Sequence, residues 1–277
     1  MSGAAALGRL RAAAGRHSVL IASASTIVFL AIVVVTFLTA PGAGRVQDAF
    51  FSTEDFGDSA GPVWEGFIIN IELMLAGEAL VLVFALLIAV VRSLPGPAAF
   101  PLRLLAIIYV DFFRGVPLIL VVFIIGLGVP ALGIGFLYTR NPFIYGLASL
   151  VLVYSAYVAE VYRAGIDSVH PSQVAAARSL GLSHGQSLRF VVIPQAVRRV
   201  IPPLLNDFIG LQKDTALVSL LGVLESVRQA QSYSAVTFNF TGYTVAAIYF
   251  VLLTIPLARF TDFLVERDRR RMRALGG

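Results

Sequence analysis

The chain has 277 residues, of which 58% are hydrophobic and only 13% are charged, and its mean hydropathy is +0.85. Soluble proteins carry about 25% charged residues, so this composition excludes a chain that faces water on all sides, and the absence of cysteine excludes disulfides and thiolate metal sites. The net charge of +5 comes from basic residues that cluster between apolar runs, which indicates membrane topology rather than nucleic-acid binding.

The first apolar run extends from Val19 to Ala40 without a charged residue, after a basic flank that contains Arg9, Arg11 and Arg16. This run is longer than the apolar region of a signal peptide. We therefore expect a retained transmembrane helix over 18–40. The following segment, 41–65, is rich in acidic residues, glycine and proline, and predicts a turn-rich connector outside the cell.

Further apolar runs predict membrane spans at 66–91, 104–129, 143–162, 200–222 and 241–261. Together with 18–40 they predict an all-α, multi-pass membrane protein with about six transmembrane helices. Long continuous runs, rather than short alternating segments, disfavour a membrane β-barrel.

The orientation follows from the basic residues, because cytoplasmic loops of membrane proteins carry the excess of Lys and Arg. With the N-terminus inside, the outside segments contain only Arg45, Arg140 and Arg228 of the 21 basic residues. Both termini are therefore expected to be cytoplasmic, as is the charged tail 263–277.

The inside segment 163–199 predicts two short helices at the membrane surface. Pro171 suits the first turn of a helix, and Gly181 suits the left-handed position after its end. Ser183 can cap a second helix, which Pro194 closes or kinks.

The first of these short helices has an unusual surface. Ala175, Ala176 and Ala177 form a run of small side chains between Val174 and Leu180. Small side chains allow close approach of another surface, so this helix suits insertion into a cleft on a partner. A surface connector without a partner is the alternative.

Polar residues inside membrane spans are functional candidates, because each costs about 2.5–3.5 kcal/mol at a helix centre. Asp111 and Arg114 share one helix face and form either an interfacial ion pair or part of a pathway. The sequence Arg114-Gly-Val-Pro117 also predicts a kink. The candidates for a substrate pathway are Glu78, Asp111, Arg114, Glu160, Asn206, Lys213 and Asp214.

Several motifs occur together in a characteristic order. Ala175-Ala-Ala177 stands three residues before Gly181, and Ile193-Pro194 follows. The accompanying motifs are Asp111-Phe-Phe-Arg-Gly-Val-Pro-Leu118, Glu160-Val-Tyr-Arg163, Asn206-Asp-Phe-Ile209 and Lys213-Asp-Thr-Ala216. Over about residues 66–262 the chain resembles the binding-protein-dependent ABC import permeases of the polar amino acid (histidine and glutamine) type, which carry an EAA loop.

The resemblance implies a type I ABC importer transmembrane domain, with a five-helix core at 66–262 and an additional N-terminal part, 1–65. It implies that the loop 163–199 contains a coupling helix, which docks into an ATP-binding subunit through Gln173, Val174, Ala175, Ala176, Ala177, Arg178, Leu180 and Gly181. Ala175 departs from the family pattern, which has an acidic residue there.

The resemblance also implies the partners: two copies of an ABC ATP-binding subunit, a second permease copy or a paralogous permease, and an extracytoplasmic amino acid-binding protein. ATP and Mg would be bound by the ATPase, so we expect neither cofactor nor metal in this chain, no catalytic residue and no nucleic acid. The expected location is the bacterial plasma (inner) membrane.

Two other classes of protein are alternatives. A stand-alone secondary transporter or channel usually contains internal repeats, and none is visible here. A membrane enzyme would need a nucleophile with its base or a metal cluster, and the sequence suggests neither.

Overall fold

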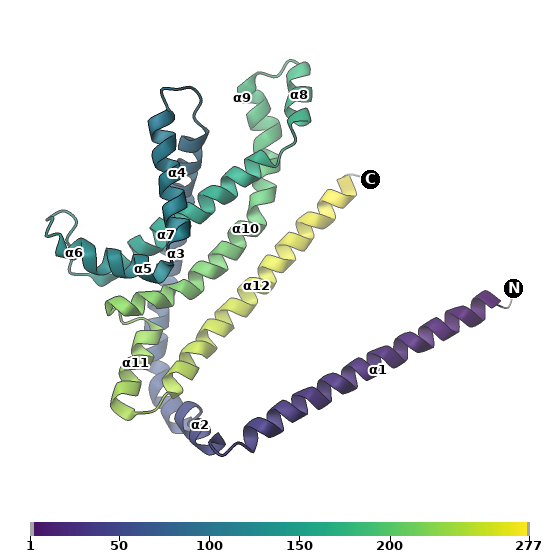
Figure 1. Ribbon diagram of the computed structural model, residues 1–277, viewed down its shortest axis with the longest axis vertical. Helices are drawn as coiled ribbons and strands as arrows, with labels where there is room; N and C mark the ends of the chain where they lie inside the picture. The colour runs from purple at the N-terminus through teal and green to yellow at the C-terminus, as the bar shows by residue number, and fades with distance from the viewer. Residues whose placement is uncertain (1–2, 276–277) are drawn as a thin grey trace. The chain divides into compact units, whose positions relative to one another are not determined.

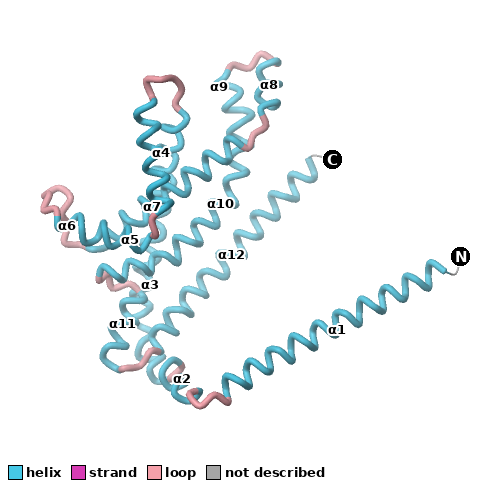
Figure 2. Tube along the Cα trace, viewed as in Figure 1, coloured by secondary structure: helices cyan, strands magenta, loops and turns pink. Residues whose placement is uncertain are grey.

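The computed structural model describes the backbone of residues 3–275, together with the side chains of residues 21–267 and 270 apart from that of residue 184. The side chains of Arg9, Arg11 and Arg16 and most of those in the tail therefore lie outside the described residues. The chain divides into two compact units, 1–52 and 53–277. The described part is helical with connecting turns and loops (Figure 2).

The first unit contains α1 (Gly3–Leu38) and α2 (Ala43–Phe50). The segment Ile21–Leu38 of α1 has a mean hydropathy of 2.5, and its apolar side chains are exposed, as expected for a helix surrounded by lipid. The predicted helix over 18–40 is confirmed. The predicted turn-rich connector at 41–65 is wrong, because α2 and the beginning of the next helix occupy most of it.

The second unit is built around α3 (Thr53–Ser93), which continues through Pro62 without ending. Val63 is fully buried against Ala230, Val245 and Ala246 from the C-terminal helices. This tertiary packing keeps the first turns of α3 helical, although proline removes a backbone hydrogen bond there.

A sharp break separates α4 (Phe100–Gly115) from α5 (Leu118–Phe123), and the helical segments Phe100–Gly115 and Leu118–Ala131 differ in direction by 109°. Val116 is extended, as the residue before a proline usually is, and Pro117 caps α5. The π-helical turn η1 (Ile124–Gly128) and α6 (Val129–Ala131) extend α5. The predicted kink is thus confirmed as a complete interruption of the helix.

The long helix α7 (Pro142–Asp167) leads into α8 (Pro171–Ser179) and α9 (His184–Ser187). The π-helical turn η2 (Leu188–Val192) then joins α9 to α10 (Ile193–Asp214). Pro194 does not close the second short helix, because α9, η2 and α10 follow one another without a break. The other predicted outcome, a kink, falls where the π-helical turn η2 directly precedes Pro194.

The chain ends with the 3-10 helix η3 (Thr215–Leu221), α11 (Ser226–Thr237) and α12 (Thr241–Leu275). Within the second unit, α3 packs against α7, α11 and α12, and α10 packs against α7 and α12. Leu73, Leu150, Leu211 and Val218 are fully buried in the main core. Figure 1 shows the α3–α4 connection and the α8–α9 turn at one end of this unit, with α11 toward the other.

Among the described residues, four helical segments are long and apolar enough to cross a membrane: Ile21–Leu38, Ala43–Ser93, Pro142–Asp167 and Thr241–Arg267. The bent pair Phe100–Gly115 and Leu118–Ala131 makes a fifth if it counts as one span. The predicted span 200–222 is not among them. It coincides with α10 and η3, whose charged residues lower its hydropathy although it packs inside the bundle.

Candidate functional site: an exposed loop and a polar cavity

The two short helices of the loop 163–199, α8 and α9, are capped by nearby side chains. His170 precedes α8, and its Nδ1 accepts a hydrogen bond from the N–H of Ser172 at 3.2 Å. Ser183 and Gln186 form a reciprocal capping box before α9: the N–H of Ser183 donates to Oε1 of Gln186 at 2.8 Å, and the N–H of Gln186 donates to Oγ of Ser183 at 3.3 Å. The predicted positions of Pro171 in the first turn of α8 and of Ser183 as the cap of α9 are confirmed.

The turn between α8 and α9 depends on Gly181, whose φ is +85°. The N–H of Leu182 donates to the carbonyl of Ala177 and that of Gly181 donates to the carbonyl of Arg178, at 3.2 and 3.0 Å. This is the Schellman pattern that ends a helix with a left-handed residue. The predicted role of Gly181 in the turn is confirmed.

The small-residue helix α8 has an inner and an outer face. Ala177 is only 4% exposed, and Val174 packs onto the cluster of Val169, Val192 and Ala196. The prediction that Ala177 belongs to an open face is therefore wrong, because this side of α8 is needed to hold it against the loop. The outer face consists of Gln173, Ala175, Ala176, Arg178 and Leu180.

Leu180 is the most conspicuous member of the outer face, since 83% of its surface is exposed. Gln173 is held by Gln195, whose Nε2 donates to its Oε1 at 2.8 Å. The outer face thus presents small and apolar side chains on a helix that is fixed from behind, at the end of the unit that carries the loop (Figure 1).

Glu160 is the centre of an ion-pair cluster at the start of the loop. It pairs with Arg92 in the last turn of α3, and its Oε2 lies 2.7 Å from Nη2 of Arg163 and 3.9 Å from Nη1 of Arg114. Arg163 also pairs with Asp167 at 2.8 Å. Glu160 is only 16% exposed, and a half-buried charge needs such partners. The cluster therefore ties together the ends of α3, α4 and α7.

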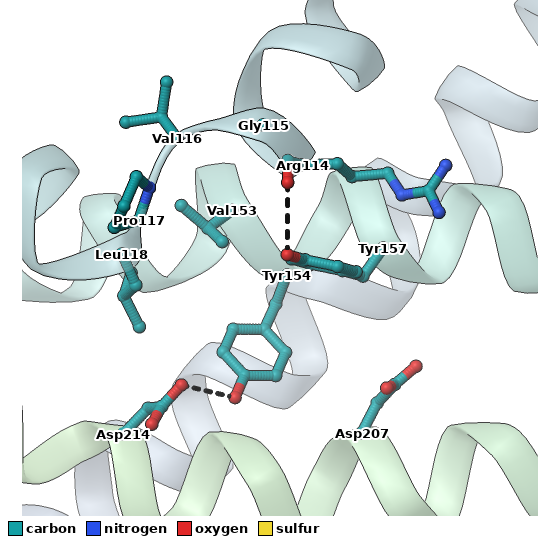
Figure 3. Close-up of a pocket in the computed structure, with 10 residues that line it drawn as sticks. All are labelled: Arg114, Gly115, Val116, Pro117, Leu118, Val153, Tyr154, Tyr157, Asp207 and Asp214. Carbon is teal, nitrogen blue, oxygen red and sulfur yellow. Dashed lines mark hydrogen bonds between the residues drawn. The ribbon is translucent and has the colours of Figure 1, made fainter.

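Next to this cluster, the break between α4 and α5 opens a cavity of about 410 Å³ toward α7 and α10 (Figure 3). Its wall consists of the backbone and side chains around the break and polar side chains from α7 and α10. The lining residues are Arg114, Gly115, Val116, Pro117, Leu118, Val153, Tyr154, Tyr157, Asp207 and Asp214.

Hydrogen bonds fix the two tyrosines of the cavity. The hydroxyl of Tyr154 donates to Oδ2 of Asp214 at 2.8 Å, and that of Tyr157 donates to the carbonyl of Arg114 at 3.4 Å. The guanidinium of Arg114 lies 5.8 Å from the centre of the Tyr157 ring. Oδ2 of Asp207 is buried without a hydrogen-bond partner. Figure 3 shows both aspartates entering from α10, opposite Arg114.

The structure brings together only some of the predicted pathway residues. Arg114, Glu160 and Asp214 lie in or beside the cavity, but Arg114 pairs with Glu160 rather than with Asp111. The predicted Asp111–Arg114 ion pair is therefore absent from the described side chains. The exposed Asp111 and Asn206 do not line this cavity.

Glu78 and Lys213 face other spaces. Glu78 lines a separate, mainly apolar cavity of about 290 Å³ with residues of α10. Lys213 lines a cavity of about 540 Å³ against α12. Lys213 and Asp214 therefore diverge, because neighbouring residues on a helix point in different directions.

A second polar cluster, which the sequence did not predict, is buried inside the unit. Oε1 and Oε2 of Glu225 accept hydrogen bonds from the N–H groups of Arg228 and Val227, at 2.7 and 3.1 Å, and so cap α11. Nδ2 of Asn70 donates to Oε2 of Glu225 at 2.9 Å and to Oγ1 of Thr215 at 3.0 Å. We call Asn70, Thr215, Glu225 and Ser226 the buried polar cluster.

Oδ1 of Asn70 accepts hydrogen bonds from the N–H and the hydroxyl of Ser226, at 3.1 and 2.7 Å. Burial raises the pKa of the Glu225 carboxyl, while the hydrogen bonds from Asn70, the backbone and Ser226 act in the opposite direction. The carboxyl is therefore held by donors from two helices, α3 and α11.

Sequence reasoning also missed Tyr154 and Tyr157 as members of the cavity. Their spacing of three on a span that ends at Glu160 puts both on one helix face, and this is the signal that could have identified them. No group of three or more His, Asp or Glu side chains suited to a metal ion occurs among the side chains that the structure describes.

The known proteins to which this chain is similar are membrane components of ABC transporters. The family described as binding-protein-dependent transport system inner membrane component matches residues 98–270. The chain is 36% identical over 168 residues to the probable glutamine ABC transporter permease protein GlnM of Bacillus subtilis, covering 60% of this chain and 76% of GlnM. It is 34% identical over 208 residues to the inner membrane amino-acid ABC transporter permease protein YhdY of Escherichia coli, covering 74% of this chain but only 56% of YhdY.

A crystal structure of an amino acid ABC transporter with histidines shares the fold, with a TM-score of 0.72 and 30% identity. The similarity covers 78% of this chain and 98% of that chain.

Proposed function

Because the chain belongs to the family of binding-protein-dependent transport system inner membrane components, we propose that it is the permease subunit of an ATP-driven ABC importer for polar or charged amino acids. The resemblance stated from the motifs is confirmed, and so is the all-helical fold of a type I importer transmembrane domain. Family membership favours the importer over a stand-alone transporter or channel.

The observation that carries the proposal is the exposed outer face of α8, at the end of the unit where the α3–α4 connection also lies (Figure 1). A large apolar side chain such as Leu180 at 83% exposure suits burial by a partner. We assign α8 the role of coupling helix, seated in a cytoplasmic ATP-binding subunit. The family's acidic residue is Ala175 here, so the contact depends on shape, Leu180, Arg178 and the Gly181 turn rather than on a charge at position 175.

The translocation path, in this proposal, includes the cavity at the α4–α5 break. Its neighbour Glu160 is tied to the ends of α3 and α4 and stands three residues before Arg163, where the loop begins. A movement of the loop would therefore act on helices that border the cavity. Coupling of this kind requires two global states that nucleotide and substrate bind differently.

The chain would be one of the two permease subunits of such a transporter. The other parts would be two ATP-binding subunits, which hold ATP and Mg and catalyse hydrolysis, a second permease copy or a paralogue, and an extracytoplasmic amino acid-binding protein. The permease itself would be non-catalytic and would sit in the bacterial plasma membrane with its loop 163–199 facing the cytoplasm.

Co-purification tests the proposal. The tagged full chain, extracted from its native membrane in mild detergent, should bring down an ATP-binding subunit, and Leu180→Asp should reduce the recovery. Val236→Asp is the matched control, since Val236 is 80% exposed on α11 and lies outside the loop. Recovery of an active transporter that works without ATP would overturn the proposal.

A further inference from the structure

We infer that the cavity at the α4–α5 break recognises a cationic amino acid, with a positive group at each end of the molecule. This inference rests on the proposed function, because it names the substrate class of the same path. It follows from the charges on the cavity wall, their pairing and their spacing.

The cavity contains two carboxylates and one guanidinium. Neither Asp207 nor Asp214 forms an ion pair within the part of the chain that the structure describes, and Oδ2 of Asp207 lacks even a hydrogen bond. Arg114 is the one basic side chain among the lining residues, and Glu160 already shares its charge at 3.9 Å. The wall is therefore negative.

A bound amino acid would bring its own charges into this space. Its α-carboxylate suits Arg114, whose side chain is 44% exposed and whose guanidinium can donate to a second partner. Its α-ammonium would satisfy one aspartate, which leaves the other aspartate without a counter-charge. A positive side chain completes the pairing, whereas a second carboxylate would face like charges.

The spacing of the aspartates supports two separate cationic contacts. Asp207 and Asp214 are two turns apart on α10, which corresponds to about 10 Å along the helix axis. Figure 3 shows the Tyr154 ring between them, with its hydroxyl on Asp214. The bond from Tyr154 occupies Oδ2 of Asp214 and leaves Oδ1 open, and the tyrosine faces favour a cation close by.

Two further charged residues, Glu78 on α3 and Lys213 on α10, line other cavities. Glu78 lines the cavity with Leu82 and Phe208, and Lys213 lines the one with Tyr243 and Thr254. Glu78 nevertheless interacts electrostatically with Asp207, so it does not offset the negative charge of the aspartate wall.

The test measures binding to the purified full chain in lipid nanodiscs, with radiolabelled lysine, glutamine and glutamate as probes at neutral pH. We expect lysine to bind at least about tenfold more tightly than glutamine, the difference that one charge-assisted contact provides. Asp207→Asn and Asp214→Asn should each weaken lysine binding about tenfold. Glutamine binding should weaken comparably only for the aspartate that holds the α-ammonium, and should change by less than about threefold for the other.

Asp262→Asn is the matched control, because Asp262 is 71% exposed on α12 and pairs with Arg259 outside the cavity. Competition between the three probes on the unmodified chain gives a second readout that does not depend on the folding of any variant. Equal binding, or a preference for glutamine or glutamate, would overturn the inference.

The two proposals fail in different ways. If none of the probes binds while an ATP-binding subunit still co-purifies, the cavity assignment is wrong and the importer function stands. If lysine binds through Asp207 and Asp214 but no ATP-binding subunit is recovered, the importer function is wrong and the cavity assignment stands.

Discussion

The loop 163–199 and the buried polar cluster both contain side chains that cap the start of a helix, but the caps differ in their surroundings. In the loop, His170 caps α8 by accepting from the N–H two positions later, and Ser183 caps α9 by accepting from the N–H three positions later. Both caps are exposed. In the buried polar cluster, Glu225 caps α11 and also accepts from Asn70, 155 residues away in the chain.

The difference separates a buried region whose polar groups bond to one another from an exposed helix face that is free to contact a partner. The side chains of Asn70, Glu225 and Ser226 are at most 2% exposed and satisfy one another, so the cluster needs no partner. The outer face of α8 is exposed and has only a few contacts behind it. An exposed face with a large apolar side chain suits burial by another surface, as the proposed docking requires.

The largest effect is expected for Gly66→Ala, which would disturb the packing of α3 against the buried polar cluster. A Cβ on residue 66 would lie 2.6 Å from both the carbonyl carbon of Glu225 and the nitrogen of Ser226. Such overpacking costs about 1–3 kcal/mol, so the midpoint of thermal unfolding in detergent should fall.

Gly57→Ala is the control for this experiment, because Gly57 is on the same helix and a Cβ there meets no atom within 4 Å. It should raise stability by up to about 1 kcal/mol through helix propensity. If both variants changed the unfolding midpoint alike, the close packing of α3 against the start of α11 would not be important for stability.

A smaller effect, on coupling rather than on stability, is expected for Gly181→Val. The left-handed φ of +85° costs a β-branched residue about 1–2 kcal/mol, although the space around it is open. We expect the chain to remain in the membrane with ATP hydrolysis retained and amino acid uptake about tenfold lower. Both rates can be measured in proteoliposomes.

Gly185→Val is the control that separates backbone strain from the added size of the side chain. Gly185 lies in α9, a Cβ there also meets open space, and its φ is not positive. It should leave uptake near the unmodified level. Normal uptake by Gly181→Val would instead argue against a coupling role for this turn.

The smallest effect concerns Tyr233, which joins α11 to the first turn of α3. A 2.7 Å hydrogen bond from its hydroxyl to Asp55 raises the pKa of Tyr233 from 10.0 to about 12. A raised pKa means that the folded protein holds this proton more tightly than the unfolded chain does. The stabilisation is therefore complete below pH 10 and is lost as the pH rises through about 12.

Tyr233→Phe should accordingly lower the unfolding midpoint at pH 8 and make little difference above pH 12. Tyr138→Phe, at a tyrosine that is 54% exposed, is the control. If the midpoints of Tyr233→Phe and the unmodified chain differed equally at both pH values, the hydrogen bond to Asp55 would not be the cause.

Local signals made the loop predictable. Pro171, Gly181 and Ser183 each act within a few residues of the chain, so their roles in the turn and the caps could be derived before any tertiary structure was considered. Pro117 likewise predicted the interruption after α4. Pro194 was expected to close or kink a helix, and the sequence did not show that a π-helical turn precedes it and continues into α10.

The cavity and the buried polar cluster depend on contacts between distant residues. Tyr154 meets Asp214 across 60 positions, and Asn70 meets Ser226 across 156. Arg114 was expected beside Asp111, its neighbour on the same helix, but the bundle offers it Glu160 from α7 instead. Helical periodicity identifies which residues share a face, but not which other helix that face meets.

The sequence by itself determined the membrane class, the helical spans with long apolar runs, and the loop between α7 and α10, because hydropathy and capping are local properties. It also carried the motifs that identify the family. Only the tertiary structure decided that α3 begins at Thr53, that α8 has one buried and one exposed face, and that two aspartates share a cavity with Arg114. These features depend on which helices pack together, and that is decided by the free energy of the whole bundle.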